Sequence, residues 1–383
     1  MNGSRRLVVR NFAQIREVSI EFGDLTVLVG AQGTGKSLTL QWLKAANDGK
    51  EIIRALREAG LRASTDQEFV DMVFGAGMGQ AWRGDSEVLY SNTQITPTYL
   101  MRRRGPTTRK VFYIPAHRSM LVSDGWAAPF QKLSSDTPVV ARLFSQTLFD
   151  LFSAKAGSPL FPVDRKLKQP LRDLINRSVF HDGLIALEED LQHRKRLRMK
   201  YGTTHLPFMT WTAGQREFTP LLLGLYHLLP SVKVTKQKYE WVVIEEPEMG
   251  LHPEAINAVL ALVLDLLSRG YRVVLSSHSP HVLTAVWMLQ RLKERHARWQ
   301  LLCEAFDLPT NSKPIQDMSE AAMKKSYKVF FFEFGDDGQV TSRDISGLDP
   351  GSEDIGEADW GGLTGYSSRF GQVVRRAVNE ASQ

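Results

Sequence analysis

The feature that most constrains this chain of 383 residues is a glycine-rich loop between a predicted strand and a predicted helix. The nearly continuous apolar run 25–29 predicts a buried strand, and the apolar positions within residues 37–46 predict the helix. A chance glycine-rich turn is the alternative, but the strand before the loop and the helix after it argue against that interpretation. The loop matches the phosphate-binding pattern at every position: Gly30, Ala31, Gln32, Gly33, Thr34, Gly35, Lys36 and Ser37.

Each part of this loop has a chemical task in binding a nucleoside triphosphate. Glycines allow backbone N–H groups to curl around phosphate oxygens, and the N-terminus of the following helix adds its positive end. The Lys36 amine can reach the β- and γ-phosphates, and the Ser37 hydroxyl can coordinate Mg²⁺. We therefore expect ATP as the ligand and Mg²⁺ as its cofactor. Further nucleotide contacts are expected from Gly30, Gln32, Gly33, Thr34 and Gly35.

Two adjacent carboxylates end a second predicted strand. The run 241–244 is short, apolar and β-branched, as buried parallel strands are, and Glu245 and Glu246 follow it directly. Ligands gather at the carboxyl ends of strands in open α/β sheets. We therefore expect Glu245 to serve the metal and Glu246 to be the catalytic base that polarises the attacking water. A solvated acidic strand end is the alternative, and a complete phosphate loop elsewhere in the chain weakens it.

A histidine follows the next predicted strand, which spans residues 272–275. A helix over residues 254–268 connects the two strands, so the segment predicts a βαβ crossover. His278 would then lie near the carboxylates, where it could bind the γ-phosphate and sense its loss. An isolated histidine is more often satisfied within its loop, but the position one βαβ unit after Glu246 favours a catalytic role for His278.

A fourth element precedes a long apolar helix predicted from about Gly214 to Leu229. Thr212, Ala213, Gly214 and Gln215 combine a hydroxyl, a glycine backbone and a helix N-terminus, which together make an anion-binding end. One phosphate loop needs no second such end for its own nucleotide, so a partner's nucleotide could use it. The alternative is an ordinary helix cap, because Thr212 followed by Gln215 also fits a capping box.

Composition excludes some classes and leaves others open. The single cysteine, Cys303, cannot form an internal disulfide, which favours a reducing compartment such as the cytoplasm. No apolar stretch is long enough to cross a bilayer, so we expect no membrane association. The net charge of +6 permits nucleic acid or an acidic partner. The basic segments 102–104, 109–110 and 194–200 could contact phosphates, but local ion pairing explains such runs more often.

The order of predicted elements indicates an α/β protein built as one two-lobed domain over residues 1–383. We expect antiparallel strands over residues 7–22 and a terminal hairpin over residues 329–341. The core lobe, with a mixed and largely parallel sheet, is assigned to residues 1–47, 110–116 and 214–345. The inserted helical lobe is assigned to about 48–109 and 117–213.

The four motifs, in this order, resemble those of ABC-type ATPases of the SMC, RecF and OLD kind. The resemblance covers Leu7 to about Leu289, and the stretches 113–119, 245–253 and 276–280 are specific to the OLD-like branch. It implies a P-loop NTPase fold and ATP hydrolysis at an interface between two head-to-tail copies.

The resemblance also assigns roles to individual residues. Residues 212–215 look like the signature loop that contacts the other subunit's γ-phosphate, and residues 250–252 look like the D-loop at the dimer interface. His278 looks like the switch histidine, and Arg118 lies where relatives place a residue that couples nucleotide to the helical lobe.

The sequence departs from the family pattern at three positions. Glu245 stands where aspartate is commoner, Gln32 replaces an asparagine, and Ala213 replaces a signature glycine. None of these changes removes a required chemical group, so they affect the expected hydrolysis rate more than ATP binding.

Two absences narrow the resemblance. No long heptad array separates Ile114 from Thr212, which excludes a coiled-coil arm. No glutamate followed by an Asp-x-Asp pair appears after His278, and a hairpin turn explains Glu333 and Asp336–Asp337 better than a nuclease metal site does. We therefore expect the ATPase part of an OLD-like system without its nuclease.

That architecture resembles the stand-alone ATPase subunits of anti-phage defence systems such as PARIS. The resemblance implies a homo-oligomer of head-to-tail dimers and a separately encoded effector, such as a TOPRIM-type nuclease. The first hypothesis is thus an ATP-driven switch that controls this effector. The alternatives are a RecF-like ATPase that clamps DNA during repair or recombination, and a scaffold that binds ATP but barely hydrolyses it.

Overall fold

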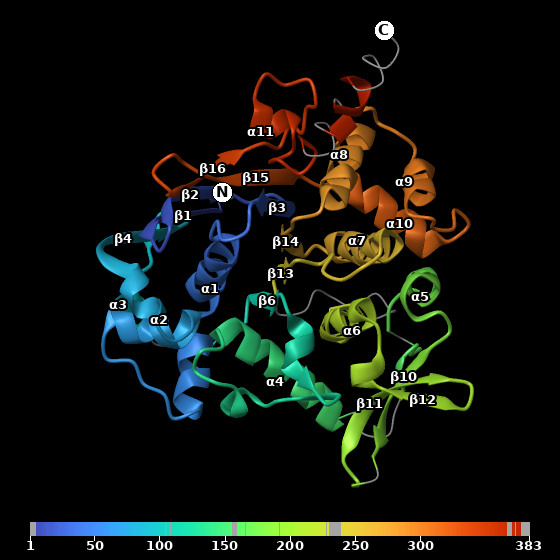
Figure 1. Cartoon of the computed structure of the whole chain (residues 1–383), viewed down its shortest axis with the longest axis horizontal. Helices are drawn as coiled ribbons and strands as arrows, with labels where there is room; N and C mark the ends of the chain where they lie inside the picture. The colour runs from blue at the N-terminus through green and yellow to red at the C-terminus, as the bar shows by residue number, and fades with distance from the viewer. Residues whose placement is uncertain are drawn as a thin grey trace.

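In the computed structural model, the described residues are 5–103, 105–107, 109–154, 159–164, 166–190, 192–226, 228–229, 239–365, 370–371 and 373–376. Within these ranges the chain forms a large mixed sheet with helices on both faces (Figure 1). The order of its ten strands is β5-β4-β1-β2-β16-β15-β3-β14-β13-β6. Their bounds are β1 Arg6–Phe12, β2 Ile15–Glu21, β3 Leu25–Gly30, β4 Trp82–Tyr90, β5 Thr93–Gln94, β6 Val111–Ile114, β13 Trp241–Glu245, β14 Arg272–Ser276, β15 Tyr327–Phe334 and β16 Val340–Asp344.

The sheet has a parallel part that leads to the candidate site and an antiparallel part beside it. Strands β15, β3, β14, β13 and β6 run parallel, each paired with its neighbour. The hairpin of β15 and β16 joins the two parts, because β15 pairs with β3 while β16 pairs with β2. The predicted terminal hairpin is confirmed, and it is an interior part of the sheet.

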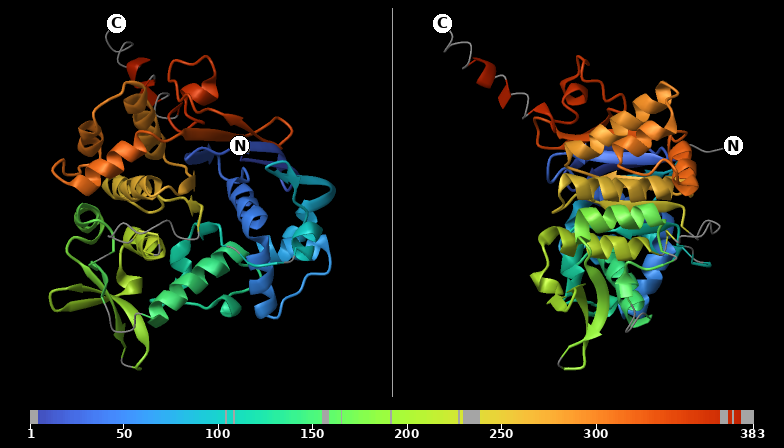
Figure 2. Two further views of the ribbon diagram at one scale, coloured as in Figure 1. Left: turned by 180° about the vertical axis from the view of Figure 1, so that it is seen from behind. Right: turned by 90° about the vertical axis from the view of Figure 1, so that its right-hand side faces the viewer.

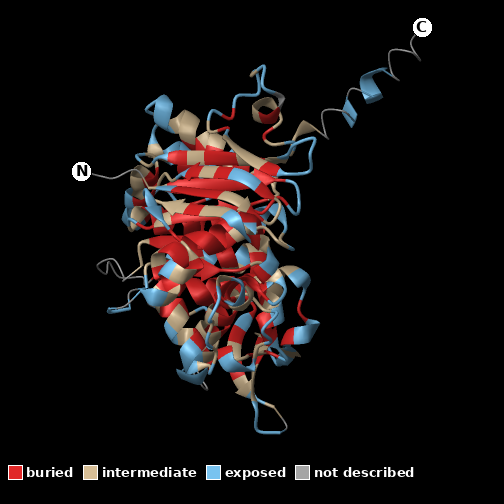
Figure 3. Cartoon of the chain, turned by 90° about the vertical axis from the view of Figure 1, so that its left-hand side faces the viewer, coloured by how far each residue is buried: buried red, intermediate tan, exposed pale blue. Residues whose placement is uncertain are grey.

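Alternating residues of the central strands pack into two separate hydrophobic cores, one on each face of the sheet. Val242 and Val273 belong to the core that also contains the apolar sides of α6 and α7. Val243 and Val274 belong to the core shared with α1, α2 and the N-terminal strands. Successive side chains of a strand point to opposite faces, so these continuous apolar runs fill both cores. Figure 2 shows helices on both faces of the sheet, and Figure 3 shows the buried residues concentrated along it.

One predicted helical unit is confirmed, and one predicted helix ends earlier than expected. The βαβ unit of β13, α7 and β14 is confirmed, and His252 caps α7 at its N-terminus. Helix α6 ends at Leu225, before the predicted end at Leu229. The bounds of the helices are α1 Lys36–Glu58, α2 Asp66–Phe74, α3 Pro97–Arg102, α4 Val139–Ala154, α5 Gln169–Ile175, α6 Ala213–Leu225, α7 Pro253–Ser268, α8 Pro280–Glu294, α9 Trp299–Ala305, α10 Lys313–Ala322 and α11 Ile355–Ala358.

A second, four-stranded antiparallel sheet belongs to the inserted lobe. Its order is β12-β11-β10-β9, and the predicted pairing of residues 183–187 with 197–201 is confirmed by β10 and β11. The strands are β9 Pro159–Phe161, β10 Leu184–Glu189, β11 Lys195–Tyr201 and β12 Thr204–Pro207. A short pair, β7 Val122–Ser123 with β8 Trp126–Ala127, lies before α4.

Residues 48–109 depart from the predicted division into lobes. Helix α1 continues past residue 47 to Glu58, and β4 pairs with β1 at the edge of the main sheet. This part of the chain therefore extends the core instead of lying wholly in the helical lobe. Short-range patterns did not reveal it, because β4 alternates weakly and is placed by pairing with a strand about seventy residues earlier.

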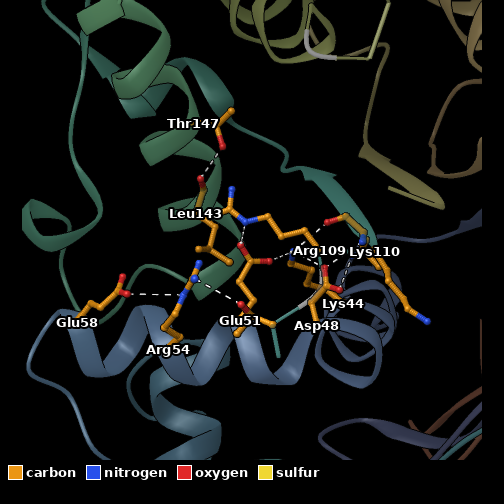
Figure 4. Close-up of polar contacts among 11 residues, drawn as sticks. Lys44, Asp48, Glu51, Arg54, Glu58, Arg109, Lys110, Leu143 and Thr147 are labelled. Atoms are coloured by element: carbon orange, nitrogen blue, oxygen red, sulfur yellow. Dashed lines mark hydrogen bonds and ion pairs between the residues drawn. The ribbon is translucent and has the colours of Figure 1, made fainter. Parts of the chain in front are cut away.

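A buried ionic network lies where α1 bends. Asp48 has non-helical backbone angles, with φ −117° and ψ 22°. Its carboxylate accepts hydrogen bonds from Lys110 N (2.7 Å) and Val111 N (3.0 Å), so it ties α1 to the start of β6. Lys44 Nζ lies 2.7 Å from Asp48 Oδ2 and 3.3 Å from Glu51 Oε2 (Figure 4). Three charged side chains thus stabilise the bend from within the core.

None of the helices in the described ranges combines the length and the apolar character that a bilayer-spanning segment requires.

Candidate nucleotide-binding site

The phosphate loop, the carboxylate pair and the histidine loop lie at the C-terminal ends of three neighbouring parallel strands. In the parallel register, Glu245 of β13 is opposite Ser276 of β14, and Ser276 is opposite Leu28 of β3. Two further backbone bonds extend this alignment beyond the strands, from Glu246 N to Ser276 O and from Ser277 N to Leu28 O, both 2.9 Å. The phosphate loop, the carboxylate pair and the histidine loop therefore meet at the C-terminal ends of these strands.

The backbone of the loop requires glycine at its turning points. Gly30, Gly33 and Gly35 have φ angles of 141°, 76° and 82°, in the region that favours glycine. A Cβ at Gly30 would lie 2.2 Å from Phe332 O, so the loop also packs too closely against β15 for a side chain. A Cβ at Gly33 would meet no atom within 4 Å, which leaves that side of the loop open for a ligand.

The Lys36 amine is held inside the loop by neutral oxygens. Its Nζ donates to Gly30 O (2.9 Å), Ala31 O (2.8 Å) and Thr34 Oγ1 (3.2 Å). Burial lowers the pKa of Lys36 to about 8, against the opposing effects of Glu246 and Glu248. A phosphate anion would compensate this burial, so the loop fits the ligand that its sequence predicts.

Glu245 fits the metal role through an oxygen without a partner. Its side chain is 5% exposed, and Oε2 accepts a hydrogen bond from Ala116 N (3.1 Å). Oε1 is buried without a hydrogen-bond partner among the described residues. Burial raises the pKa of Glu245, while the nearby Ser37 hydroxyl acts to lower it. A divalent cation between Ser37 and Glu245 would satisfy this oxygen, and water and phosphate oxygens commonly supply the other Mg²⁺ ligands.

Glu246 and His278 face each other at the C-terminal ends of β13 and β14. Glu246 has a φ of 41°, an uncommon conformation for a residue with a side chain. Its Oε1 lies 3.8 Å from His278 Nε2, and the side chains are 32% and 28% exposed, respectively. Burial lowers the pKa of His278, and Lys36 acts in the same direction. Both groups are accessible from solvent and close to Lys36, as a base and a phosphate sensor would need to be.

Glu248 holds the histidine loop, a role that sequence reasoning missed. Its Oε1 accepts hydrogen bonds from His278 N (2.7 Å) and Ser277 Oγ (2.9 Å). Its Oε2 is buried without a partner among the described residues, and burial raises the pKa of the carboxyl. The signal in the sequence was a third carboxylate only two residues after Glu246. Which loop it contacts depends on the packing of β13 against β14.

Arg118 connects the carboxylate strand to α6. The residue is fully buried in the short 3₁₀ helix η2 (Arg118–Leu121), and burial lowers its pKa. Its guanidinium donates to Glu245 O (3.0 Å), Glu246 O (3.3 Å) and Glu217 O (3.0 Å). One side chain therefore bonds both the end of β13 and the first turns of the helix that follows Thr212.

Residues 212–215 form the capping box that was the alternative interpretation. Thr212 Oγ1 accepts from Gln215 N, and Gln215 Oε1 accepts from Thr212 N, each at 3.2 Å. Ala213 is exposed at the first position of α6, and a Cβ at Gly214 would lie 2.8 Å from Gly250 O. No hydrogen bond within the described chain joins these residues to the loop 30–37. The same protomer does not bring the two anion-binding ends together through such bonds.

Two comparisons found known proteins that resemble parts of this chain. Residues 210–284 match the AAA_21 family model, which is described as "AAA domain, putative AbiEii toxin, Type IV TA system". The chain is 41% identical over 51 residues to the Old nuclease of Escherichia phage P2, a stretch that covers 13% of this chain and 9% of that protein. The match thus spans a small part of that nuclease.

Solved structures with partial likeness are ATPase heads and cassettes. An SMC head bound to the C-terminal winged-helix domain of ScpA is 12% identical, with a TM-score of 0.40, over 89% of this chain and 97% of that one. The SMC head domain from Thermotoga maritima is 12% identical, with a TM-score of 0.35, over 89% and 98% of the two chains. A dimeric bacterial ABC transporter cassette is 10% identical, with a TM-score of 0.33, over 72% and 89%.

These TM-scores are low, and the strand order and motif geometry of the chain itself define its fold. The strand order and the loop geometry give an α/β fold of the P-loop type, and residues 210–284 resemble an AAA domain.

Proposed function

We propose that this protein hydrolyses ATP at an interface between two head-to-tail copies and acts as a nucleotide-dependent switch. The observation that carries the proposal is the division of the chemistry. The loop 30–37, Glu245, Glu246 and His278 lie at the C-terminal ends of the parallel strands. Among the described residues, the second anion-binding end at Thr212 has no hydrogen bond to that loop. A second copy that presents its Thr212–Gln215 turn to the γ-phosphate would complete the site.

Each site residue at the C-terminal ends of the parallel strands has a role in this reaction. The loop backbone, Lys36 and Thr34 hold the phosphates, and Ser37 and Glu245 would hold Mg²⁺. The bound cation would neutralise negative charge on the phosphate oxygens during the transfer. Glu246 accepts the proton of the attacking water, and Glu248 positions the histidine loop so that His278 reaches the γ-phosphate.

Arg118 gives the switch a physical connection. Its bonds to the Glu245 and Glu246 carbonyls and to the Glu217 carbonyl lie between the catalytic strand and α6. A change at the phosphate end of β13 would therefore shift the start of α6, where the partner's nucleotide is contacted. This is the coupling role expected for Arg118.

The cellular role follows from the resemblance to stand-alone defence ATPases such as the PARIS subunit. The phage P2 relative is named a nuclease, but it is much longer than the matched stretch. In this chain Glu333 pairs with Arg343, and Asp337 pairs with Arg16. We propose that the switch controls a separate effector in anti-phage defence, with a TOPRIM-type nuclease as the first candidate.

The composite site is tested by mixing two inactive variants. Lys36→Ala removes the phosphate amine. Ala213→Glu places a negative charge at the exposed first position of α6, where an acidic residue is favourable for the helix itself. In a heterodimer of the two variants, one interface carries both defects and the other carries neither.

Random pairing makes about half of the dimers heterodimers, each with one intact site, so the mixture recovers about a quarter of the wild-type rate. The readout is phosphate release with gel filtration in ATP as a control for dimer formation. If the mixture stays inactive although dimers form, or if Ala213→Glu alone is fully active, each protomer has a complete site and the proposal fails.

A further inference from the structure

Positive charge is concentrated at the far end of α1, away from the candidate site. Two adjoining hollows of about 640 and 410 Å³ share Ile53, Arg57 and Met101 in their walls. We call them together the basic groove. Its cationic side chains come from the second half of α1, the segment after it and the end of α3: Lys50, Arg54, Arg57, Arg62, Arg102 and Arg103. Arg104, which belongs to the same predicted basic segment, lies outside the described residues.

These charges are poorly balanced by acidic groups. Glu58 is the one carboxylate among the residues that line the two hollows, and it lies 3.6 Å from Arg54 (Figure 4). Arg57, Arg62 and Arg102 have no ion pair within the described chain, and all three are exposed. Six cationic side chains and one carboxylate line the groove, so its local net charge is +5.

The second basic segment, residues 194–200, forms local ion pairs with nearby carboxylates. Lys200 and Arg194 pair with Glu188 and Asp190, and the strand register also places Arg196 opposite Glu188. The expectation of local ion pairing is thus met for Arg194 and Lys200 of residues 194–200. It is not met in the basic groove.

The floor of the groove is apolar, which narrows the kind of partner. Ile53, Leu61 and Met101 are half-buried there, and Leu56 below them is 2% exposed. A sugar–phosphate backbone would pair with the rim but has little apolar surface to bury on this floor. A protein segment with alternating carboxylates and apolar side chains would use both parts, because guanidinium groups bind carboxylates in a bidentate manner.

The chain's own acid-rich segment is already engaged elsewhere. In residues 349–359, Asp354 pairs with Arg343, and the adjacent Trp360 is buried against Trp287. This segment therefore does not fill the groove, which is open to a partner protein.

We propose that the basic groove is a docking site for an acidic, apolar-anchored segment of a partner protein. The guanidinium groups of Arg57, Arg62 and Arg102 bind the carboxylates of that segment. Ile53 and Met101 contact its apolar side chains.

The test uses the full chain and three fluorescein-labelled probes in an anisotropy titration: a Glu/Leu peptide, a poly-Glu peptide of equal length, and a mixed-sequence DNA duplex. We expect the Glu/Leu peptide to bind at least tenfold more tightly than the other two. Arg57→Ala combined with Arg102→Ala should weaken its binding about tenfold, since each exposed ion pair contributes a modest amount. Met101→Ser should weaken the Glu/Leu peptide and leave poly-Glu unchanged.

The matched control is Arg295→Ala, which removes another exposed arginine at a helix C-terminus, that of α8. It should leave all affinities unchanged. Equal binding of both peptides, or an unchanged affinity in the Arg57/Arg102 variant, overturns the proposal. If the duplex binds most tightly and loses affinity in that variant, the groove is a nucleic-acid site instead, as a RecF-like protein would require.

Discussion

Replacing Lys44 with methionine tests whether the ionic network at the bend of α1 is essential for stability. Lys44 is buried, and although burial lowers the pKa of its amine, Asp48 and Glu51 raise it. Its Nζ also donates to Val111 O (2.9 Å). Methionine keeps the volume but removes the charge, so both carboxylates lose their common cation.

The loss in free energy of unfolding depends on the hydrogen bonds and ion pairs that Asp48 and Glu51 keep in the Lys44→Met variant. Removing one partner of a buried ion pair costs about 3–5 kcal/mol. Asp48 keeps its two backbone donors, and Glu51 keeps its ion pair with Arg109, so neither carboxylate is left bare. We therefore expect a loss at the lower end, about 3 kcal/mol, which is a change on the order of 100-fold in the ratio of folded to unfolded protein.

Urea unfolding measures this change, followed in parallel by tryptophan fluorescence and far-UV circular dichroism. Coincident curves would show that both probes report a single transition. The matched control is Glu58→Gln, which breaks the exposed pair with Arg54 on the same helix and should cost less than about 0.5 kcal/mol. A loss below about 1 kcal/mol for Lys44→Met, or equal losses for the two variants, would refute the reasoning.

Three further predictions concern the candidate site. Glu246→Gln should retain ATP binding and lower phosphate release by about 10²–10⁴-fold, and unchanged release would remove Glu246 from its role. Lys36→Ala should weaken ATP binding about 10–100-fold by calorimetry, because a charge-assisted contact contributes about 1.5–3 kcal/mol; undiminished affinity would contradict this. Glu248→Ala should lower kcat about tenfold with unchanged ATP affinity, while Glu248→Gln, which still accepts both bonds of the histidine loop, should keep most activity; equal rates in the two variants would argue against positioning.

The motifs of the site were readable from the sequence because each is short and contiguous. The glycines of the loop 30–37 have the positive φ angles that the pattern implies. Glu245 ends β13, Glu246 follows it directly, and His278 lies two residues after the end of β14. The βαβ unit around α7 was readable for the same reason, since a few neighbouring residues specify its strands and caps. Their catalytic roles remain predictions until turnover is measured.

Tertiary structure decided how these motifs meet. Strand β14 lies between the loop strand β3 and the carboxylate strand β13, and the terminal strand β15 pairs with the other side of β3. Strand β4 joins the sheet edge against prediction for the same physical reason. Pairing between segments far apart in the chain is chosen by the burial of whole faces, which no local window contains.

The hydrogen bonds of Arg118 and the walls of the basic groove also join residues that are far apart in the sequence. Arg118 bonds to Glu217 and to Glu245, about 100 and 130 residues away. The basic groove likewise joins residues of α1 to Met101 and Arg102, about fifty residues later. Residue types and local spacing thus determined which chemical groups the protein carries. Packing of distant segments alone determined which groups share a surface, because contact energy depends on proximity in space and not on order in the chain.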